Sequence, residues 1–232
     1  MLKKIIENFI SKLKKERFQF DRKVSILYIM VIMLEYIFCY LRGCFKVIFF
    51  GEKGKILLIG KNVNIKCHNK IFVGNNFYIE ENVEIDALSK KGIRCGNNVK
   101  IGKGSILRCS GSLKDIGEGF ECGNNVYFGD NCFFGSAGGI KIGNDIISGQ
   151  NVRFHSENHN YTDINTLVRL QGVNRKGIEI GNNCWIGSGV TILDGVTIGN
   201  GVVIAANSVI NKNIPNNVVV GGIPCKILKE RI

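Results

Sequence analysis

Histidine is the side chain whose type best suits proton transfer near neutral pH, and this chain of 232 residues has three, His68, His155 and His159. An unperturbed imidazole titrates near neutrality, so it can serve as a general base toward a hydroxyl group. No Gly-x-Ser-x-Gly sequence occurs, which argues against a serine nucleophile and a covalent acyl-enzyme. The histidines are therefore the first candidates for chemistry, and their use depends on what positions them.

The composition limits the class of protein and its partners. Apolar residues make up 45% of the chain and charged residues 22%, which excludes general disorder. The nine cysteines form no Cys-x-x-Cys pair, so we expect small buried side chains in a reducing compartment and no metal site. The formal net charge of +12 favours an anionic partner, which could be nucleic acid, anionic lipid or a phosphorylated cofactor.

A six-residue repeat organises the chain from about Ile59 onward. The clearest run, over residues 180–209, reads IGNNCW, IGSGVT, ILDGVT, IGNGVV, IAANSV. The large apolar first position and the small or β-branched fifth position point inward, while Gly, Asn and Asp between them tolerate the left-handed backbone of a corner. Each hexapeptide is then one strand and one turn, and three make one coil of a triangular prism. The repeat predicts a mainly β protein, a parallel β-helix of about seven coils.

The six-residue frame is interrupted in four places. Breaks occur around residues 87–92, 108–115, 136–139 and 157–177. Loops leave a solenoid where function needs side chains away from the wall. The longest one follows directly after His155 and contains His159, which makes this loop the expected place of a functional site.

The two ends of the chain do not follow the repeat, so we divide it into residues 1–54, 55–223 and 224–232. Residues 1–20 have helical spacing, with a basic face opposite an apolar one, and residues 24–50 are strongly apolar. The segment 1–54 is interpreted as an end cap or oligomer contact, as a peripheral attachment to an anionic membrane, or as a transmembrane helix. Glu35 within the apolar stretch argues against the last.

The first long apolar stretch begins only at Val24, too late for a secretory signal, so we expect a cytoplasmic protein that can attach to the inner face of the membrane. The final segment, 224–232, is predicted to be a short helix beginning at Cys225.

The C-terminal part of the repeat resembles a known family. The run IGNNCWIGSGVTILDGVTIGNGVVIAANSVINKNIPNNVVVGGIPCKILK is similar to the signature of the hexapeptide-repeat acyltransferases. Within them it most resembles the sugar O-acetyltransferases of the galactoside, maltose and nodulation type and those of capsule and O-antigen synthesis. The resemblance covers about residues 55–232. It implies a left-handed parallel β-helix, a homotrimer with active sites between subunits, and acetyl-CoA as the acyl donor.

The resemblance also assigns roles near the active site. His159, in the sequence SENHNYTD, occupies the place of the family's catalytic histidine and is expected to be the general base. Asp163 resembles a carboxylate that follows this histidine in some relatives. The expected wall of the site and orienting groups for the acceptor are His155, Asn158, Asn160 and Trp185.

Further positions match the family's contacts with coenzyme A. Small residues beside the pantetheine arm and cations near the phosphates are expected from five positions, Ser188, Ala206, Lys212, Lys226 and Lys229. The sequence departs from the family pattern where Asn207 replaces a glycine, Asn211 a threonine and Cys225 an alanine. The first of these affects how closely a cofactor can approach.

The expected function is therefore transfer of an acetyl group from acetyl-CoA to a sugar hydroxyl in the biosynthesis of a surface polysaccharide. Three alternatives stay open. In the first, the acceptor is a small sugar or amino sugar in the cytosol, which is acetylated on nitrogen or oxygen. In the second, the protein is a non-enzymatic β-helix scaffold. In the third, it is a zinc enzyme of the γ-carbonic-anhydrase type, which needs three converging histidines. Nucleic acid is not an expected partner, because no stacked aromatic and basic motif occurs.

Overall fold

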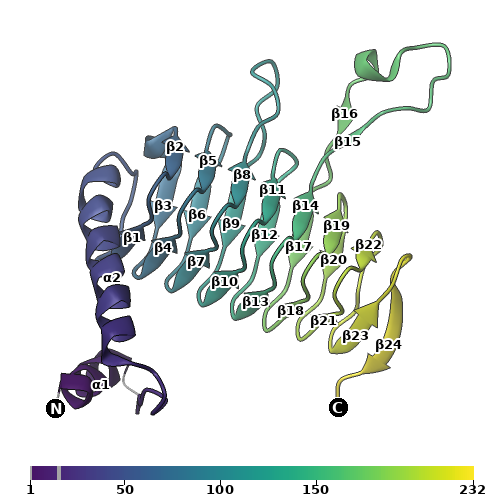
Figure 1. Ribbon diagram of the computed structural model, residues 1–232. Coiled ribbons are helices and arrows are strands. Elements are labelled where there is room, and N and C mark those ends of the chain that lie inside the picture. The colour runs from purple at the N-terminus through teal and green to yellow at the C-terminus, as the bar shows by residue number, and fades with distance from the viewer. Residues whose placement is uncertain (1, 15–16) are drawn as a thin grey trace.

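The computed structural model describes residues 2–14 and 17–232, which form two N-terminal helices followed by a triangular parallel β-helix (Figure 1). The helical spacing predicted for residues 1–20 places Lys15 on the basic face, but Lys15 lies outside the described residues. So do the side chains of six residues whose faces were predicted, Leu2, Phe9, Ile10, Lys12, Leu13 and Lys14.

Three parallel sheets form the walls of the prism. The first face comprises β1 (Leu57–Ile59), β4 (Phe77–Ile79), β7 (Val99–Ile101), β10 (Val126–Phe128), β13 (Ile146–Ser148), β18 (Trp185–Ile186), β21 (Val203–Ile204), β23 (Val218–Gly221) and the antiparallel β24 (Lys226–Glu230). The second face comprises β2 (Asn64–Lys66), β5 (Glu84–Asp86), β8 (Ile106–Arg108), β11 (Phe133–Gly135), β14 (Arg153–His155), β19 (Thr191–Leu193) and β22 (Val209–Ile210). The third face comprises β3 (Ile71–Val73), β6 (Ile93–Cys95), β9 (Phe120–Cys122), β12 (Ile140–Ile142), β17 (Ile178–Ile180) and β20 (Thr197–Ile198).

The interior of the prism is apolar, as the repeat predicts. First-position residues such as Ile142, Ile180 and Ile198 lie in register on neighbouring coils and are buried. Aromatic side chains fill the middle coils, where the ring of Phe134 stacks on that of Phe154 at 5.0 Å between centroids. Burial of this column is the main favourable term for the fold. The predicted parallel β-helix is confirmed.

One corner of the prism explains why Gly-Asn-Asn recurs. At Gly123 a Cβ atom would lie 2.4 Å from Oδ1 of Asn144 on the next coil, so the coils stack closely only without a side chain there. Asn144 Oδ1 accepts hydrogen bonds from the backbone N and from Nδ2 of Asn124, at 2.8 and 3.2 Å. Asn125 then has a φ of 58°, in the left-handed region that asparagine tolerates. The motif therefore encodes both the turn and the contact between coils.

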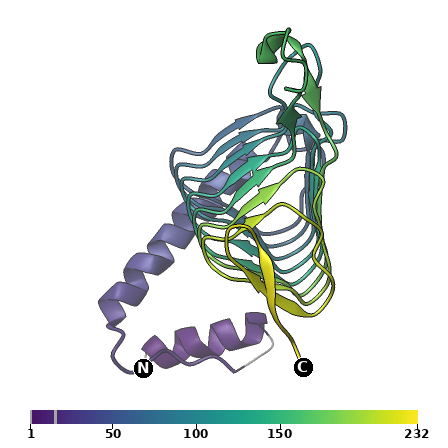
Figure 2. The same ribbon diagram turned by 90° about the vertical axis from the view of Figure 1, so that its right-hand side faces the viewer.

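All four interruptions of the repeat lie at the same corner, where the second face passes into the third (Figure 2). They connect β5 to β6, β8 to β9, β11 to β12 and β14 to β17. The longest contains β15 (Asn158–His159), the 3-10 helix η2 (Val168–Leu170) and β16 (Val173–Asn174), and it projects as a hairpin from the prism (Figure 1). We call residues 157–177 the projecting hairpin. Stacking of coils thus gathers the irregular segments along one edge.

The helix α2 (Ile26–Lys46) packs against the first coil, and α1 (Leu2–Lys14) precedes it. Arg42 Nη1 donates a hydrogen bond to the carbonyl of Ile59 at 2.9 Å, and Lys46 Nζ donates to the carbonyl of Val63. A Cβ atom on Gly43 would lie 2.0 Å from the carbonyl oxygen of Leu57. The C-terminal half of α2 therefore covers the open end of the first coil. Covering that end protects it from edge pairing.

The expectation of a short helix beginning at Cys225 is wrong. Residues Lys226–Glu230 form strand β24, which pairs antiparallel with β23 on the first face. The chain reverses at Gly222, whose φ of 98° suits glycine. Unpaired backbone groups at the last edge of the sheet favour a pairing strand, because an open edge would leave them without partners.

Candidate active site

The projecting hairpin positions His159. His159 lies on β15 and pairs with Val173 of β16, and its side chain is exposed. The next residue continues the pairing, since Asn160 donates from its backbone N to the carbonyl of Gly172 and from Nδ2 to the carbonyl of Gln171, both at 3.0 Å. The backbone of His159 is therefore held in a hydrogen-bonded hairpin, and Asn160 contributes to that hairpin through its amide.

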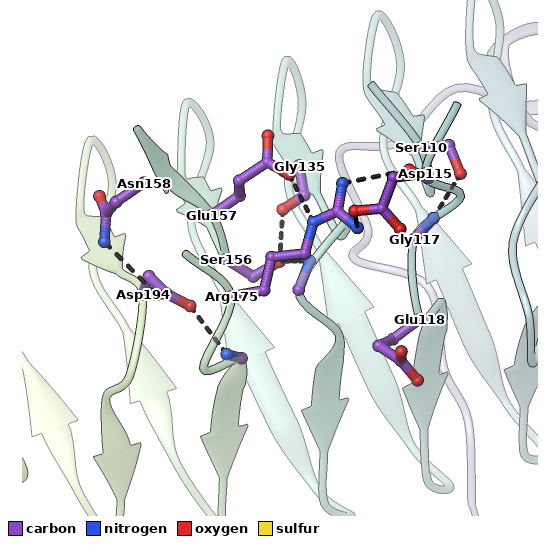
Figure 3. A network of polar contacts seen from close by, with 12 residues as sticks. Ser110, Asp115, Gly117, Glu118, Gly135, Ser156, Glu157, Asn158, Arg175 and Asp194 are labelled. Carbon is purple, nitrogen blue, oxygen red and sulfur yellow. Dashed lines mark hydrogen bonds and ion pairs between the residues drawn. The ribbon is translucent and has the colours of Figure 1, made fainter. Parts of the chain in front are cut away.

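Asp194 holds the two ends of the hairpin together. Its Oδ1 accepts the backbone N–H groups of Lys176 and Gly177 at 2.9 and 2.7 Å, and its Oδ2 accepts Nδ2 of Asn158 at 3.4 Å (Figure 3). Asp194 thus closes the hairpin next to His159. The sequence reasoning missed it, although ILDGVT places an acidic residue where the neighbouring hexapeptides have Ser or Asn.

Arg175 links the hairpin to the loop that follows β8. Its Nε donates to Glu157 Oε2 at 2.6 Å, its Nη1 to Asp115 Oδ2 at 2.7 Å and its Nη2 to the Asp115 carbonyl at 3.2 Å. Figure 3 shows the guanidinium between the two carboxylates. Its side chain is only 16% exposed, so these charge-assisted bonds are less screened than those of a surface pair.

Asp163 stabilises a turn within the hairpin. Its Oδ2 accepts from Thr166 Oγ1 at 2.7 Å and its Oδ1 from the backbone N of Asn165 at 2.9 Å. These hydrogen bonds, the one from Thr166 first, lower the pKa of the Asp163 carboxyl. Gln171 completes the turn by accepting from the backbone N of Asp163 at 3.2 Å. The contacts of this carboxylate are therefore with the loop that carries it.

His155 lies at the end of β14 on the second face, in register between Gly135 and Leu193 of the adjacent coils. Its ring contacts that of Phe133 at 5.5 Å between centroids. Burial, followed by the positive charge of Arg153, lowers the pKa of His155. Both effects disfavour the charged form of the imidazole, which suits a packing role close to the root of the hairpin.

Trp185 occupies a different face from the hairpin. It lies on β18 of the first face and is 56% exposed, in register between Ile147 and Val203. The hairpin instead leaves the corner between the second and third faces. Within one copy of the chain, the indole is therefore separated from His159 by the width of the third face.

The residues expected to contact coenzyme A fall into three groups. Ser188 and Ala206 lie on adjacent coils at the corner between the first and second faces, where Ser188 Oγ donates to Gln150 Oε1 at 2.9 Å. Lys212 follows β22 at the corner that carries the hairpin, and two more exposed lysines lie on β24, Lys226 and Lys229. Asn207 adopts a φ of 57°, so it makes a left-handed turn at the position where the resemblance led us to expect glycine.

A hollow on the third face adjoins the end of the hairpin. It has a volume of about 280 Å³, and Lys176 and Gly177 form part of its wall. Its charged lining is mixed in sign and comprises Lys91, Lys141, Lys176, Glu118, Glu121 and Glu179. Lysines at this position can meet an anionic group, while the glutamates limit the net charge of the hollow.

His68 lies far from the other two histidines in the order of coils. It begins the 3-10 helix η1 (His68–Lys70) after β2, the first strand of the second face, whereas His155 ends β14, the fifth. The His68 ring instead lies 6.1 Å from that of Phe50. Within residues 2–14 and 17–232 no three His, Cys, Asp or Glu side chains gather as a metal site would require.

One known protein family matches the part of the chain that adjoins the candidate site. The family described as bacterial transferase hexapeptide (six repeats) matches residues 177–212, which run from the end of the projecting hairpin to Lys212. Residues 177–212 are therefore a hexapeptide-repeat segment of this type. The repeat provides the walls of the prism, and the insertion of the hairpin provides the candidate site.

Curated relatives of this chain carry acetyltransferase names. The galactoside O-acetyltransferase of Escherichia coli K12 is 36% identical over 92 residues, which cover 39% of this chain and 44% of the relative. A protein of the same organism named for an O-acetyl transferase of lipopolysaccharide biosynthesis, WbbJ, is 33% identical over 98 residues, 39% of this chain and 50% of the relative. The chain spans about half the length of the curated relatives it matches.

A solved structure extends the likeness in fold to most of the chain. A variant of AntD, an N-acyltransferase from Bacillus cereus solved with dTDP and coenzyme A, aligns over 81% of this chain and 88% of AntD, with a TM-score of 0.57 and 19% identity. At that identity the likeness concerns the fold, which is a left-handed parallel β-helix.

Proposed function

We propose that this protein transfers an acetyl group from acetyl-CoA to a hydroxyl of a sugar, with His159 as the general base. The observation that carries the proposal is the place of His159, exposed on a hydrogen-bonded hairpin that interrupts an otherwise regular β-helix. The names of the curated relatives support acetyl transfer to sugars.

In the proposed reaction, the imidazole of His159 removes the proton of the acceptor hydroxyl as its oxygen attacks the thioester carbonyl. A C–O bond forms, the C–S bond breaks, and the thiolate of coenzyme A leaves and takes a proton from the imidazolium. No covalent acyl-enzyme is needed in this direct transfer. Asp194 and Arg175 act indirectly, because they hold the hairpin that carries the base.

We assign the binding of coenzyme A to the five positions named above, with Ser188 and Ala206 beside the pantetheine arm and Lys212, Lys226 and Lys229 toward the phosphates. The net charge of +12 supports an anionic cosubstrate.

Trp185 belongs to the proposed site only if a neighbouring copy supplies it, because the indole and His159 lie on different parts of one prism. We therefore propose a homotrimer with sites between subunits. Exposed apolar residues in register on the first face, Tyr127, Ile147 and Trp185, support burial of that face.

We further propose that the acceptor is a sugar of a surface polysaccharide or of its precursor. The relative named for lipopolysaccharide biosynthesis supports this acceptor class. An acceptor panel that includes a free hexose, a nucleotide-linked amino sugar and a host polysaccharide tests it, with the product read by mass spectrometry. An amide product on the amino sugar alone would contradict O-acetylation.

The test of the general base is the His159→Ala variant. Loss of general-base catalysis should lower kcat by about 10²- to 10⁴-fold, measured as release of the thiol of coenzyme A in the presence of an acceptor. His68→Ala is the matched control, because His68 lies at the other end of the prism. A His159→Ala variant with the wild-type kcat, or a His68→Ala variant that loses activity equally while still folded, would overturn the assignment.

A further inference from the structure

The helix α2 exposes apolar side chains over most of its circumference. Cys39 and Gly43, together with Ile29, are its buried residues. Successive residues of an α-helix are 100° apart around its axis, so six exposed apolar side chains together span more than half of the circumference of α2. They are Leu27, Tyr28, Met30, Met33, Leu34 and Ile37. A helix that packs on one protein partner needs an apolar stripe of about 100°. The wider surface of α2 is typical of contact with lipid.

The segment before α2 is basic. Residues 1–25 contain eight lysines and arginines against three acidic residues. Within it, Lys3 Nζ donates to the carbonyls of Asp21 and Val24, at 2.7 and 3.2 Å, which holds α1 to the linker that begins α2. Figure 2 shows the N-terminal half of α2 extending past the prism, with α1 near its free end. Lys3, Lys4, Arg22 and Lys23, which belong to the described residues, therefore lie at the start of α1 and in the linker that leads into the exposed apolar surface.

The attachment of α2 to the first coil limits how deeply it can enter a bilayer. By length and composition α2 could cross a membrane. Its last turns are however held on the prism by Arg42, Gly43 and Lys46. The ring of Tyr36 already lies 5.7 Å from that of Tyr78 on β4, so the free part of α2 is residues 26–34. This part rises about 13 Å, whereas the hydrocarbon core is about 30 Å thick. The free part therefore reaches into one leaflet while the prism stays outside.

We propose that α1 and residues 26–34 form a docking surface for the interface of an anionic phospholipid bilayer. The apolar side chains of α2 enter the boundary between headgroups and acyl chains, and the basic residues of 1–25 contact lipid phosphates. A second copy of the chain is a poorer occupant, because it would bring two basic segments of the same sign together. The surface is independent of the proposed acetyl transfer, so each can fail without the other.

The test uses the full chain and flotation with vesicles of phosphatidylcholine, with and without phosphatidylglycerol. We expect binding to the anionic vesicles that weakens in high salt. The Leu27→Glu/Leu34→Glu variant should bind at least about tenfold more weakly, because two exposed leucines that would enter the bilayer are replaced by charges. Leu113→Glu is the matched control, since Leu113 is 85% exposed in the loop after β8. A third variant, Lys4→Glu/Arg22→Glu/Lys23→Glu, tests the basic contribution.

Several outcomes would overturn the proposal. One is equal binding of all variants, or no binding of the wild type to anionic vesicles. A second is a Leu27→Glu/Leu34→Glu variant that changes oligomeric state by light scattering, because the surface would then be an interface between copies. A third is protection of the N-terminus from protease inside sealed vesicles, which would show a spanning helix. Retained circular dichroism of each variant separates these outcomes from unfolding.

Discussion

At the scale of single residues, His155 and His159 differ in surroundings although only four positions separate them. His155 is half-buried on the prism wall, with its pKa lowered by burial and by Arg153. His159 is exposed on the hairpin. The chain therefore holds one histidine in a packed position that disfavours its charged form, and leaves the other accessible to solvent.

The Arg153→Gln variant should raise the pKa of His155 toward its ordinary value, because one of the two causes of the lowered pKa is removed. A titration of the His155 ring followed by NMR measures this change. Arg153→Lys, which keeps the charge, is the control. An unchanged pKa in Arg153→Gln would leave burial as the sole cause.

The same lowered pKa makes stability depend on pH. Because the folded state binds the proton less readily than the unfolded state, the contribution of His155 is fully present above the unfolded pKa of about 6.5 and is lost as pH falls toward the folded pKa. Between these two pKa values the free energy of unfolding should rise with pH. A His155→Gln variant should reduce that slope in urea denaturation, and an unchanged slope would contradict this assignment.

At the scale of elements, the projecting hairpin depends on contacts made at its root. Arg175 joins Glu157 of the hairpin to Asp115 of the neighbouring loop. Asp194 joins the two ends of the hairpin from the next coil. The position of His159 is thus set by side chains on three separate connections.

The Arg175→Gln variant should loosen the hairpin, because it leaves the carboxylate of Glu157 without its cationic partner. The amide of Asn160, which bonds to Gly172, should exchange with solvent about tenfold faster. Hydrogen exchange by mass spectrometry measures this, and kcat should fall in parallel. Arg169→Gln is the matched control, an exposed arginine of the same hairpin. Equal exchange in both variants would contradict a positioning role for Arg175.

At the scale of the whole molecule, stability comes from contacts between adjacent coils repeated along the axis. The column of stacked asparagines Asn75, Asn97, Asn124 and Asn144 shows this most directly, since Oδ1 of each of the last three accepts a hydrogen bond from the backbone N of the asparagine on the preceding coil.

Asn124→Ala should lower the free energy of unfolding by about 0.5–1.5 kcal/mol, because the backbone N of Asn97 loses its acceptor. Asn211→Ala, on an exposed turn, is the control. Chemical denaturation measures the difference, and equal stability of the two variants would refute the role of the column.

Much of the fold could be read from the residues alone, because a short repeat carries its own burial pattern and turn chemistry. The six-residue phase placed Ile180 inward and Gly-Asn-Asn at a corner, and each requirement is local to one hexapeptide. The same phase showed where the chain leaves the wall, and so singled out His159. The prediction of a helix for the tail was wrong. Residues Lys226–Glu230 form a strand because they pair with the open edge of the sheet, and their own sequence does not show that this edge is there.

Other features required the three-dimensional arrangement. Arg175 meets Asp115 across sixty positions of sequence, because stacking of coils brings two insertions to one corner. Trp185 and His159, which the resemblance assigns to one site, lie on different parts of the prism, since the chain turns a corner between them. The reach of α2 beyond the first coil also depended on where Arg42 and Lys46 attach. The spacing of residues along the chain determines which side chains of each coil are buried and where the chain turns. Which coils and loops contact one another is determined only by how the coils stack.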